Sequence, residues 1–178
     1  IFVASYNLNG CSATTKLENW LFPDIYVVGF QEIVQPGYVQ LRSGQLVGTA
    51  LMIFVEGTVK KTGAVAIRFD YEDTGLCFIT SHLAAGYTNY DERDHDYRTI
   101  ASGLNHDYVV WFGDFNYRDQ LNKQMLTGKV FPFFSELPIT FPRVPAWTDR
   151  ILYRGELVSY QSVPLYYSDH RPIYATYE

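Results

Sequence analysis

The sequence predicts an α/β protein that is rich in strands and has few helices. Asp107–Phe112 is apolar, β-branched or aromatic, and Gly113 follows it directly, which is typical of a buried strand. Asp114 and Asn116 stand just past this strand, and in extended geometry residues two apart face the same pocket. Ser168–His170 precedes another strand in the same way. A carboxylate can take a proton or orient a water, and an amide can donate to an anion, so these strand ends indicate hydrolytic chemistry.

Eight strands are predicted from runs of apolar, β-branched and aromatic residues bounded by turn signals. In chain order they are Ile1–Tyr6, Ile25–Phe30, Leu46–Phe54, Ala64–Phe69, Leu76–Thr80, Tyr108–Phe112, Arg150–Tyr153 and Pro172–Tyr177. Because the first residues already form a strand, we expect a domain excised from a longer protein.

Two helices are predicted between the strands. The first spans Asp91–Leu104, with Asp91 as its N-cap, acidic residues in its first turn and Gly103 near its end. The second, shorter helix spans Asp119–Leu126 and is closed by Gly128. Neither an internal repeat nor a low-complexity segment is present in the sequence.

Several connections are too short for the elements that they join. Typical loops have about 4–6 residues, and parallel crossovers need about a dozen or more. We therefore expect one domain over residues 1–178 from which internal loops are missing, near Pro23–Asp24 and Phe141–Arg143. Unbroken Cα spacing of about 3.8 Å at both places would contradict this hypothesis.

Composition narrows the class of protein. A length of 178 residues suits one domain with a sizeable core, and no run of 18 apolar residues or signal peptide is present. Cys11 and Cys77 are the only cysteines and have no metal-binding spacing, which favours a reduced intracellular protein. The net charge of −5 argues against a broad nucleic-acid surface, although a basic pocket or a metal could still bind a small anion.

Eight polar residues fall at or near predicted strand ends: Asn7, Glu32, His82, Asp114, Asn116, Asp149, Asp169 and His170. Most of them have an ordinary alternative when taken singly: a turn residue, a salt-bridge partner, a hydrogen-bonded structural histidine or a surface ion pair. Taken together they fit hydrolysis assisted by Mg²⁺, because hard divalent cations prefer oxygen ligands, and they do not fit a zinc site.

Six segments, in this order, resemble the Mg²⁺-dependent inositol polyphosphate 5-phosphatases, and most closely those of the synaptojanin group. They are Asn7–Gly10, Gly29–Glu32, Thr80–Leu83, Trp111–Arg118, Pro145–Leu152 and Ser168–Pro172, and they span nearly the whole chain. The blocks Gly113–Arg118 and Pro145–Leu152 are specific to this family. Gln31-Glu32 and Ser168–His170 are shared more widely with DNase I-like nucleases.

The resemblance implies a DNase I-like α+β fold, a four-layer sandwich of two mainly antiparallel sheets packed face to face with helices outside. It implies removal of the 5-phosphate from phosphatidylinositol 4,5-bisphosphate and related inositol polyphosphates by in-line attack of water. The cofactor would be Mg²⁺, with Ca²⁺ or Mn²⁺ able to occupy the site. The domain would be a monomeric part of a larger cytoplasmic protein, peripheral at membranes, and would not bind nucleic acid.

The resemblance also assigns roles near the metal. Glu32 would bind Mg²⁺, with Asn7 near the metal or the scissile phosphate. Asp114 would orient and deprotonate the attacking water, and Asn116 would donate to the phosphoryl group.

Other implied roles concern the phosphate. His170, in its charged form, would stabilise the transition state while Asp149 holds its other ring nitrogen. Asp169 would support the metal or the water network, and His82 would contact the phosphate. Arg118 and Arg143 would bind substrate, and Arg143 is suited to read the 4-phosphate as a planar, bidentate donor.

The chain departs from the family pattern at the suspected missing loops. Lys60–Val65 keeps only the end of a Gly-Asn-Lys-Gly-Ala-Val stretch, and a Tyr-Lys element is absent ahead of Arg143. Two other functions remain open: a DNase I-like nuclease, which would need a basic groove, and an inactive phosphoinositide-binding module. The inactive module would be expected to have lost Glu32, Asp114 or His170, and all three are present.

Overall fold

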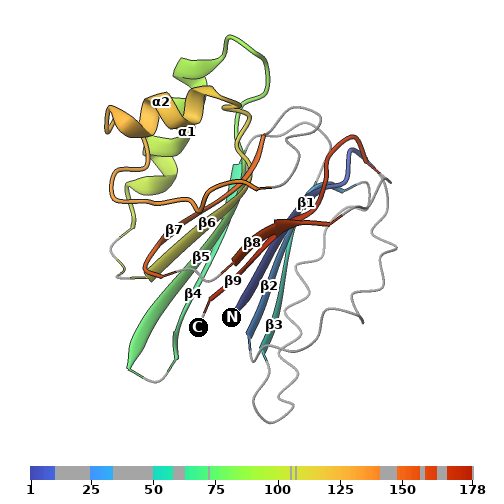
Figure 1. Cartoon of the computed structure of the whole chain (residues 1–178), viewed down its shortest axis with the longest axis vertical. Helices are drawn as coiled ribbons and strands as arrows, with labels where there is room; N and C mark the ends of the chain where they lie inside the picture. The colour runs from blue at the N-terminus through green and yellow to red at the C-terminus, as the bar shows by residue number, and fades with distance from the viewer. Residues whose placement is uncertain are drawn as a thin grey trace.

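The computed structural model describes residues 1–10, 25–33, 50–57, 63–71, 73–104, 106, 108–140, 148–156, 159–163 and 168–177. Two β-sheets face each other, and both described helices lie on the outer side of one sheet (Figure 1). Three of the four predicted layers are therefore observed, and a fourth is not among the described residues. The suspected seams at Pro23–Asp24 and Phe141–Arg143 also lie outside these ranges.

The first sheet has five strands in the order β3-β2-β1-β9-β8. Their bounds are β1 Phe2–Asn7, β2 Ile25–Ile33, β3 Ala50–Gly57, β8 Ser159–Ser162 and β9 Ile173–Thr176. The pairs β1/β2 and β2/β3 are parallel, whereas β1/β9 and β8/β9 are antiparallel. The sequence did not predict β8, because its residues Ser-Tyr-Gln-Ser are short and polar, as an edge strand allows.

The second sheet has four strands in the order β4-β5-β6-β7. Their bounds are β4 Gly63–Tyr71, β5 Thr74–His82, β6 Tyr108–Asp114 and β7 Asp149–Arg154. The pairs β4/β5 and β6/β7 are antiparallel, and β5/β6 is parallel. Both sheets are thus mixed, with four antiparallel and three parallel pairs between them, and all eight predicted strands are present with shifted ends.

The helices differ from their predictions at the ends. Helix α1 spans Tyr90–Ala101 and helix α2 spans Gln120–Leu126. The prediction that Asp91 is the N-cap of the first helix is wrong: Asn89 holds that position, and Asp91 lies inside the first turn. Leu104 also lies outside α1, because the chain leaves the helix at Ser102. Acidic residues are favourable both at the N-cap and in the first turn, because a carboxylate in the first turn also lies near the positive end of the helix dipole.

Alternating side chains divide the core between two faces of each sheet. Between the sheets, Val3 and Val27 pack with Phe78, Phe112 and other residues of the facing strands. Under the helices, a second cluster is centred on the fully buried Trp111, whose ring lies in edge contact with neighbouring aromatic rings. Aromatic side chains therefore fill much of the space between this sheet and the helices.

Candidate active site

The topology brings the candidate residues to one edge of the sandwich. Parallel strands β5 and β6 end there with His82 and Asp114, which are paired in register. Strand β7 runs antiparallel to β6, so it begins at this edge with Asp149 opposite Asp114. Strand β1 ends with Asn7, and the antiparallel β9 is preceded there by His170. Strand direction alone therefore gathers side chains from distant parts of the chain.

Strand alternation also aims most of these side chains into the space between the sheets. On β6, Val110 and Phe112 pack between the sheets, so Asp114, two residues further on, has the same orientation. The same alternation carries from Phe78 to His82 on β5. The candidate site is thus a polar continuation of the apolar core.

Glu32 breaks this alternation and needs a backbone irregularity to reach the site. It follows the inward-facing Gln31 on β2, and the register between β2 and β3 shifts between Phe30 and Ile33. Glu32 itself has φ +53, in the left-handed region that non-glycine residues rarely adopt. Such a bulge re-aims one side chain, and strained backbone of this kind is concentrated at functional sites.

Asn7 joins the two acidic residues from opposite sheets. Its Nδ2 donates to Asp114 Oδ2 at 2.9 Å and to Glu32 Oε1 at 3.1 Å. Its Oδ1 accepts the backbone N–H of Asn9 at 2.9 Å. In this arrangement the amide holds the carboxylates together, and the assignment of Asn7 as a metal ligand stays a prediction.

A cluster able to hold a metal ion lies beside Asn7. The ligand atoms of Glu32, His82 and Asp114 lie within 4.8 Å of one another. His82 Nε2 is 3.7 Å from Glu32 Oε1 and 3.8 Å from Asp114 Oδ2. Two carboxylates at this spacing fit a hard divalent cation, and the predicted phosphate-binding His82 belongs to the same group.

Asp149 and His170 form the tightest polar pair of the site. His170 Nδ1 lies 2.6 Å from Asp149 Oδ2, and His170 Nε2 points to Asp114 Oδ2 at 3.8 Å. Burial lowers the pKa of His170, but the hydrogen bond and charge of Asp149, followed by Asp114, outweigh it and raise this pKa to about 9. Burial raises the pKa of Asp149 to about 6, against the opposing effect of His170. At neutral pH the pair is therefore an imidazolium and a carboxylate.

The turn after β6 corrects the extended-geometry argument for Asp114 and Asn116. Asn116 has φ +54, so the chain is not extended there. Instead, Asp114 Oδ1 accepts the backbone N–H of Asn116 at 3.1 Å, and Asn116 Nδ2 donates to the carbonyl of Leu83 at 3.0 Å. The two residues still adjoin, because a side-chain hydrogen bond closes the turn.

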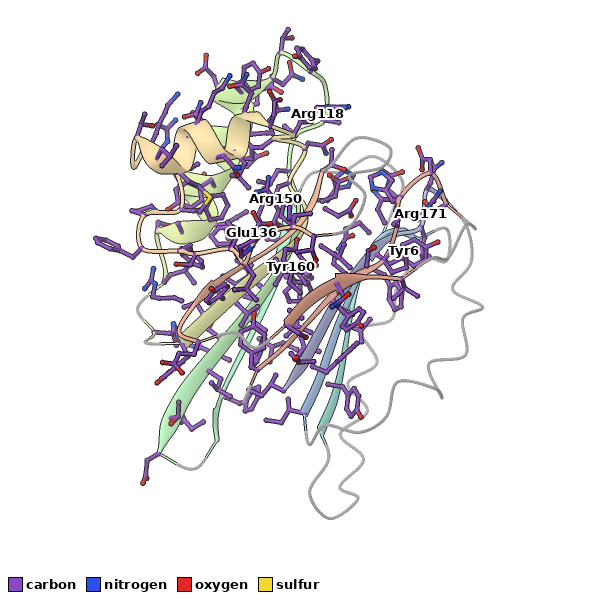
Figure 2. All side chains as sticks on the ribbon, in the orientation of Figure 1. Tyr6, Arg118, Glu136, Arg150, Tyr160 and Arg171 are labelled. Atoms are coloured by element: carbon purple, nitrogen blue, oxygen red, sulfur yellow. The ribbon has the colours of Figure 1, made fainter. Side chains whose placement is uncertain are left out.

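The remaining predicted site residues make fewer described contacts with the residues above. Asp169 is exposed, and its Oδ1 lies 3.3 Å from Ser168 Oγ. Arg118 is half-buried at the beginning of α2 (Figure 2), and its backbone carbonyl accepts a bond from Arg150. Arg143 lies outside the described residues. The substrate-binding roles of Arg118 and Arg143 and the role of Asp169 stay predictions.

Two residues that the sequence reasoning did not assign help to build the site. Ser168 Oγ donates to the Asn7 carbonyl at 2.8 Å and accepts the backbone N–H of His170 at 3.1 Å. Thr148 Oγ1 lies 3.4 Å from Asp149 Oδ2 and 3.5 Å from His170 Nδ1. Thr148 and Ser168 directly precede Asp149 and Asp169, and this position was the available signal, since a hydroxyl can donate to or accept from a neighbouring polar group.

Known proteins with similar sequences cover all or nearly all of the chain. The pattern described as Endonuclease/Exonuclease/phosphatase family 2 matches residues 55–119 and 118–176. Inositol-1,4,5-trisphosphate 5-phosphatase 1 of Schizosaccharomyces pombe is 62% identical over 100% of this chain and 27% of its own length. Phosphatidylinositol 4,5-bisphosphate 5-phosphatase INP51 of Saccharomyces cerevisiae is 32% identical over 99% of this chain and 31% of its own length.

A solved structure is similar throughout the chain. It is the inositol polyphosphate 5-phosphatase domain of SPsynaptojanin in complex with inositol (1,4)-bisphosphate and calcium ion. The identity is 62%, the TM-score is 0.78, and the match covers 98% of this chain and 82% of that one. This likeness confirms the predicted fold class.

The chain spans about a third or less of the length of these two curated relatives. The alignment with the S. pombe protein extends over 288 positions, more than the 178 residues of this chain, so the relative carries additional segments between the matched ones. Within the described part of the chain, no helix is long and apolar enough to cross a bilayer.

Proposed function

The chain belongs to the endonuclease/exonuclease/phosphatase family and, within it, to the inositol polyphosphate 5-phosphatases, and we propose from this that it hydrolyses the 5-phosphate of inositol polyphosphates and of phosphatidylinositol 4,5-bisphosphate. One observation carries the proposal. Asp114 Oδ2 accepts a hydrogen bond from Asn7 and faces a ring nitrogen of both His82 and His170 at 3.8 Å. A buried carboxylate surrounded in this way suits general-base catalysis.

Water is the nucleophile in this reaction. Asp114 takes a proton from it as its oxygen attacks phosphorus, and the bond between phosphorus and the inositol oxygen breaks on the opposite side. The inositol oxygen takes a proton from solvent, so the products are inorganic phosphate and an inositol with a free 5-hydroxyl. The inositol (1,4)-bisphosphate bound in the SPsynaptojanin domain has the composition of such a product.

A divalent cation fits the residues present. Glu32 would hold it, with Asp114 and His82 beside it, because the ligand atoms of the three residues lie within 4.8 Å of one another. When bound, the ion neutralises charge on the phosphate oxygens and on the leaving oxygen. The SPsynaptojanin domain carries calcium. We propose Mg²⁺ as the working ion, because it favours carboxylates, water and phosphate as ligands.

His170 provides the complementary positive charge. Its pKa of about 9 keeps the imidazole protonated at neutral pH, and Asp149 fixes the ring through Nδ1 at 2.6 Å. Nε2 is then a donor directed to the side of the site where Asp114 lies. A fixed cation of this kind stabilises charge that develops on the phosphoryl oxygens in the transition state.

The test is phosphate release from a 4,5-bisphosphorylated inositol lipid, and from soluble inositol 1,4,5-trisphosphate, with Mg²⁺ and with chelator. We expect metal-dependent release of the 5-phosphate by the wild type and none by Asp114→Asn. Comparison of the two substrates separates lipid from soluble specificity. Substrate binding without release in Mg²⁺ would instead favour a non-catalytic binding module.

A further inference from the structure

Arg150 is a fully buried cation that the proposed chemistry does not use. It follows Asp149 on β7, and the alternation of the strand directs the two side chains to opposite faces of the sheet. Ile151 packs between the sheets and Leu152 packs under the helices, so Arg150 lies on the helix side. A guanidinium is costly to bury unless it is paired and hydrogen-bonded, so we infer the role of Arg150 from the groups that it binds.

The Arg150 guanidinium joins three segments around the site. Nε donates to Glu136 Oε1 at 2.7 Å, and Nη2 completes a two-pronged ion pair with Glu136 Oε2. Nη2 also donates to Asn122 Oδ1 on α2 at 2.8 Å, and Nη1 donates to the backbone carbonyl of Arg118 at 3.3 Å. The segment before residues 141–147, helix α2 and the turn after β6 are therefore held by one side chain.

The turn after β6 requires such support. Asn116 and Arg118 both have φ +54, a conformation that persists only where the surrounding structure fixes it. The turn begins with Asp114, whose carboxylate forms its first hydrogen bond. The bond from Arg150 to the carbonyl of Arg118 fixes its other end.

Glu136 extends the connection to the other sheet. Tyr160 of β8 donates its hydroxyl to Glu136 Oε1 at 3.2 Å, and the same hydroxyl accepts the backbone N–H of Ile151 at 3.2 Å. Figure 2 shows Arg150, Glu136 and Tyr160 gathered between α2 and β8. Asn7 and Glu32 lie on the five-stranded sheet and Asp114 lies on the four-stranded sheet. A link between the two sheets therefore affects the distance between Glu32 and Asp114.

We propose that Arg150 and Glu136 are positioning residues that set the turn carrying Asp114 and the spacing of the two sheets at the active site. They touch no reacting group. The expected change in kcat rests on the proposed function. The expected change in the spacing of Glu32 and Asp114 does not, because metal binding can be measured without turnover. Mutation of residues that orient metal-binding or catalytic groups without contacting the ligand typically lowers metal affinity or activity by about 10–100-fold.

The test compares Arg150→Met, Glu136→Leu and the double variant. Each single change removes one partner of the buried ion pair and should lower stability, whereas the double variant removes both charges and should recover it. In the double variant we expect kcat to stay about tenfold below wild type with KM nearly unchanged, and Mn²⁺ binding to weaken about tenfold. Tyr160→Phe, which removes one hydroxyl, should show a smaller loss in the same direction if the double variant does not fold.

The control is Leu76→Ala, at the other end of β5 from His82, which removes core packing without touching the pair. It should lower the unfolding midpoint while the folded protein keeps wild-type kcat and Mn²⁺ affinity. A folded double variant with wild-type Mn²⁺ affinity would overturn the inference, and so would a wild type that binds no Mn²⁺. Absence of phosphate release by the wild type would instead count against the proposed function alone.

Discussion

Asp114 has different partners on its two carboxylate oxygens. Oδ1 closes the turn to Asn116, and Oδ2 accepts from Asn7 and faces His82 and His170. The residue is therefore both a structural link and the proposed base. Both oxygens are hydrogen-bond acceptors, so an asparagine of the same shape can keep one of these two contacts, and only the carboxylate can take up a proton.

Replacement of Asp114 by Asn separates these roles. Asp114→Asn should lower phosphate release by about 10²–10⁴-fold, because the amide cannot take the proton of water. Inositol phosphate binding should be largely retained, since the shape of the side chain is kept. Rapid-quench turnover and calorimetric binding measure the two effects, and a variant that keeps a tenth of wild-type turnover would exclude Asp114 as the base.

The Asp149–His170 pair predicts a pH dependence. Because the pKa of His170 is raised from 6.5 to about 9, its charged form stabilises the fold fully below about pH 6.5, and this contribution is lost as pH rises through about 9. The value of kcat/KM should fall over the same upper range, and also below about pH 6 as Asp149 takes up a proton. Asp149→Asn should move the alkaline limb to lower pH, which a pH–rate profile measures. An alkaline limb that does not move would show that Asp149 does not control the charge of His170.

At the scale of elements, helix α1 holds the loop that follows His82. Arg93 is fully buried, and its Nη1 donates to the carbonyls of Ala84 at 2.8 Å and Gly86 at 2.7 Å. Its guanidinium also lies over the ring of Tyr117, at 5.4 Å from the ring centroid. The helix therefore fixes the loop next to Leu83, whose carbonyl binds Asn116.

Removal of this cation should loosen the loop. Arg93→Ala should lower the free energy of unfolding by about 3 kcal/mol, because the buried carbonyl of Ala84 and the partly buried carbonyl of Gly86 lose a charged donor. Denaturant titration measures the stability, and hydrogen exchange at residues 84–87 should rise. Arg98→Ala, exposed on the same helix, is the matched control and should change stability little. Equal effects of the two changes would contradict the role of Arg93.

At the scale of the whole molecule, the sheets approach closely at Gly29. A Cβ built on this residue of β2 would lie 2.5 Å from Thr80 Oγ1 and 2.6 Å from Phe112 Cε2 on the facing sheet. Gly29→Ala should therefore force the sheets apart and cost about 1–3 kcal/mol of stability. Gly103→Ala, where a Cβ meets no atom within 4 Å, should be nearly neutral. Thermal unfolding of both variants tests the difference, and similar midpoints would show that the sheets adjust without cost.

Metal binding should also stabilise the whole molecule, because the cluster of Glu32, His82 and Asp114 joins the two sheets. Mg²⁺ or Mn²⁺ at about 100 times its dissociation constant should add about 2.7 kcal/mol to the free energy of unfolding. Glu32→Gln should lose most of this gain. Thermal unfolding with metal and with EDTA measures it, and an equal gain in the variant would place the ion elsewhere.

Much of this arrangement follows from the sequence alone. Apolar and β-branched runs determine the strands, since a pleated backbone buries every second side chain on each face. The same alternation determines that the side chain of Asp114 points between the sheets. Asn7, His82 and Asp149 lie at strand ends, which places them at a sheet edge. The motif blocks identified the family, because their residue types and spacing are specific.

Other features depend on contacts between segments far apart in the chain, and only the tertiary structure decided them. The bulge at Glu32 reverses the direction that alternation predicts, and the positive φ of Asn116 replaces an extended turn. The pairing of Asp149 with His170 depends on how the two sheets face each other, and the pairing of Arg150 with Glu136 depends on the segment at Ser135, which forms a β-bridge with Tyr153 of β7. Local sequence determines what each segment can form, whereas the fold determines which charges meet, because an ion pair can be buried only where both partners arrive together.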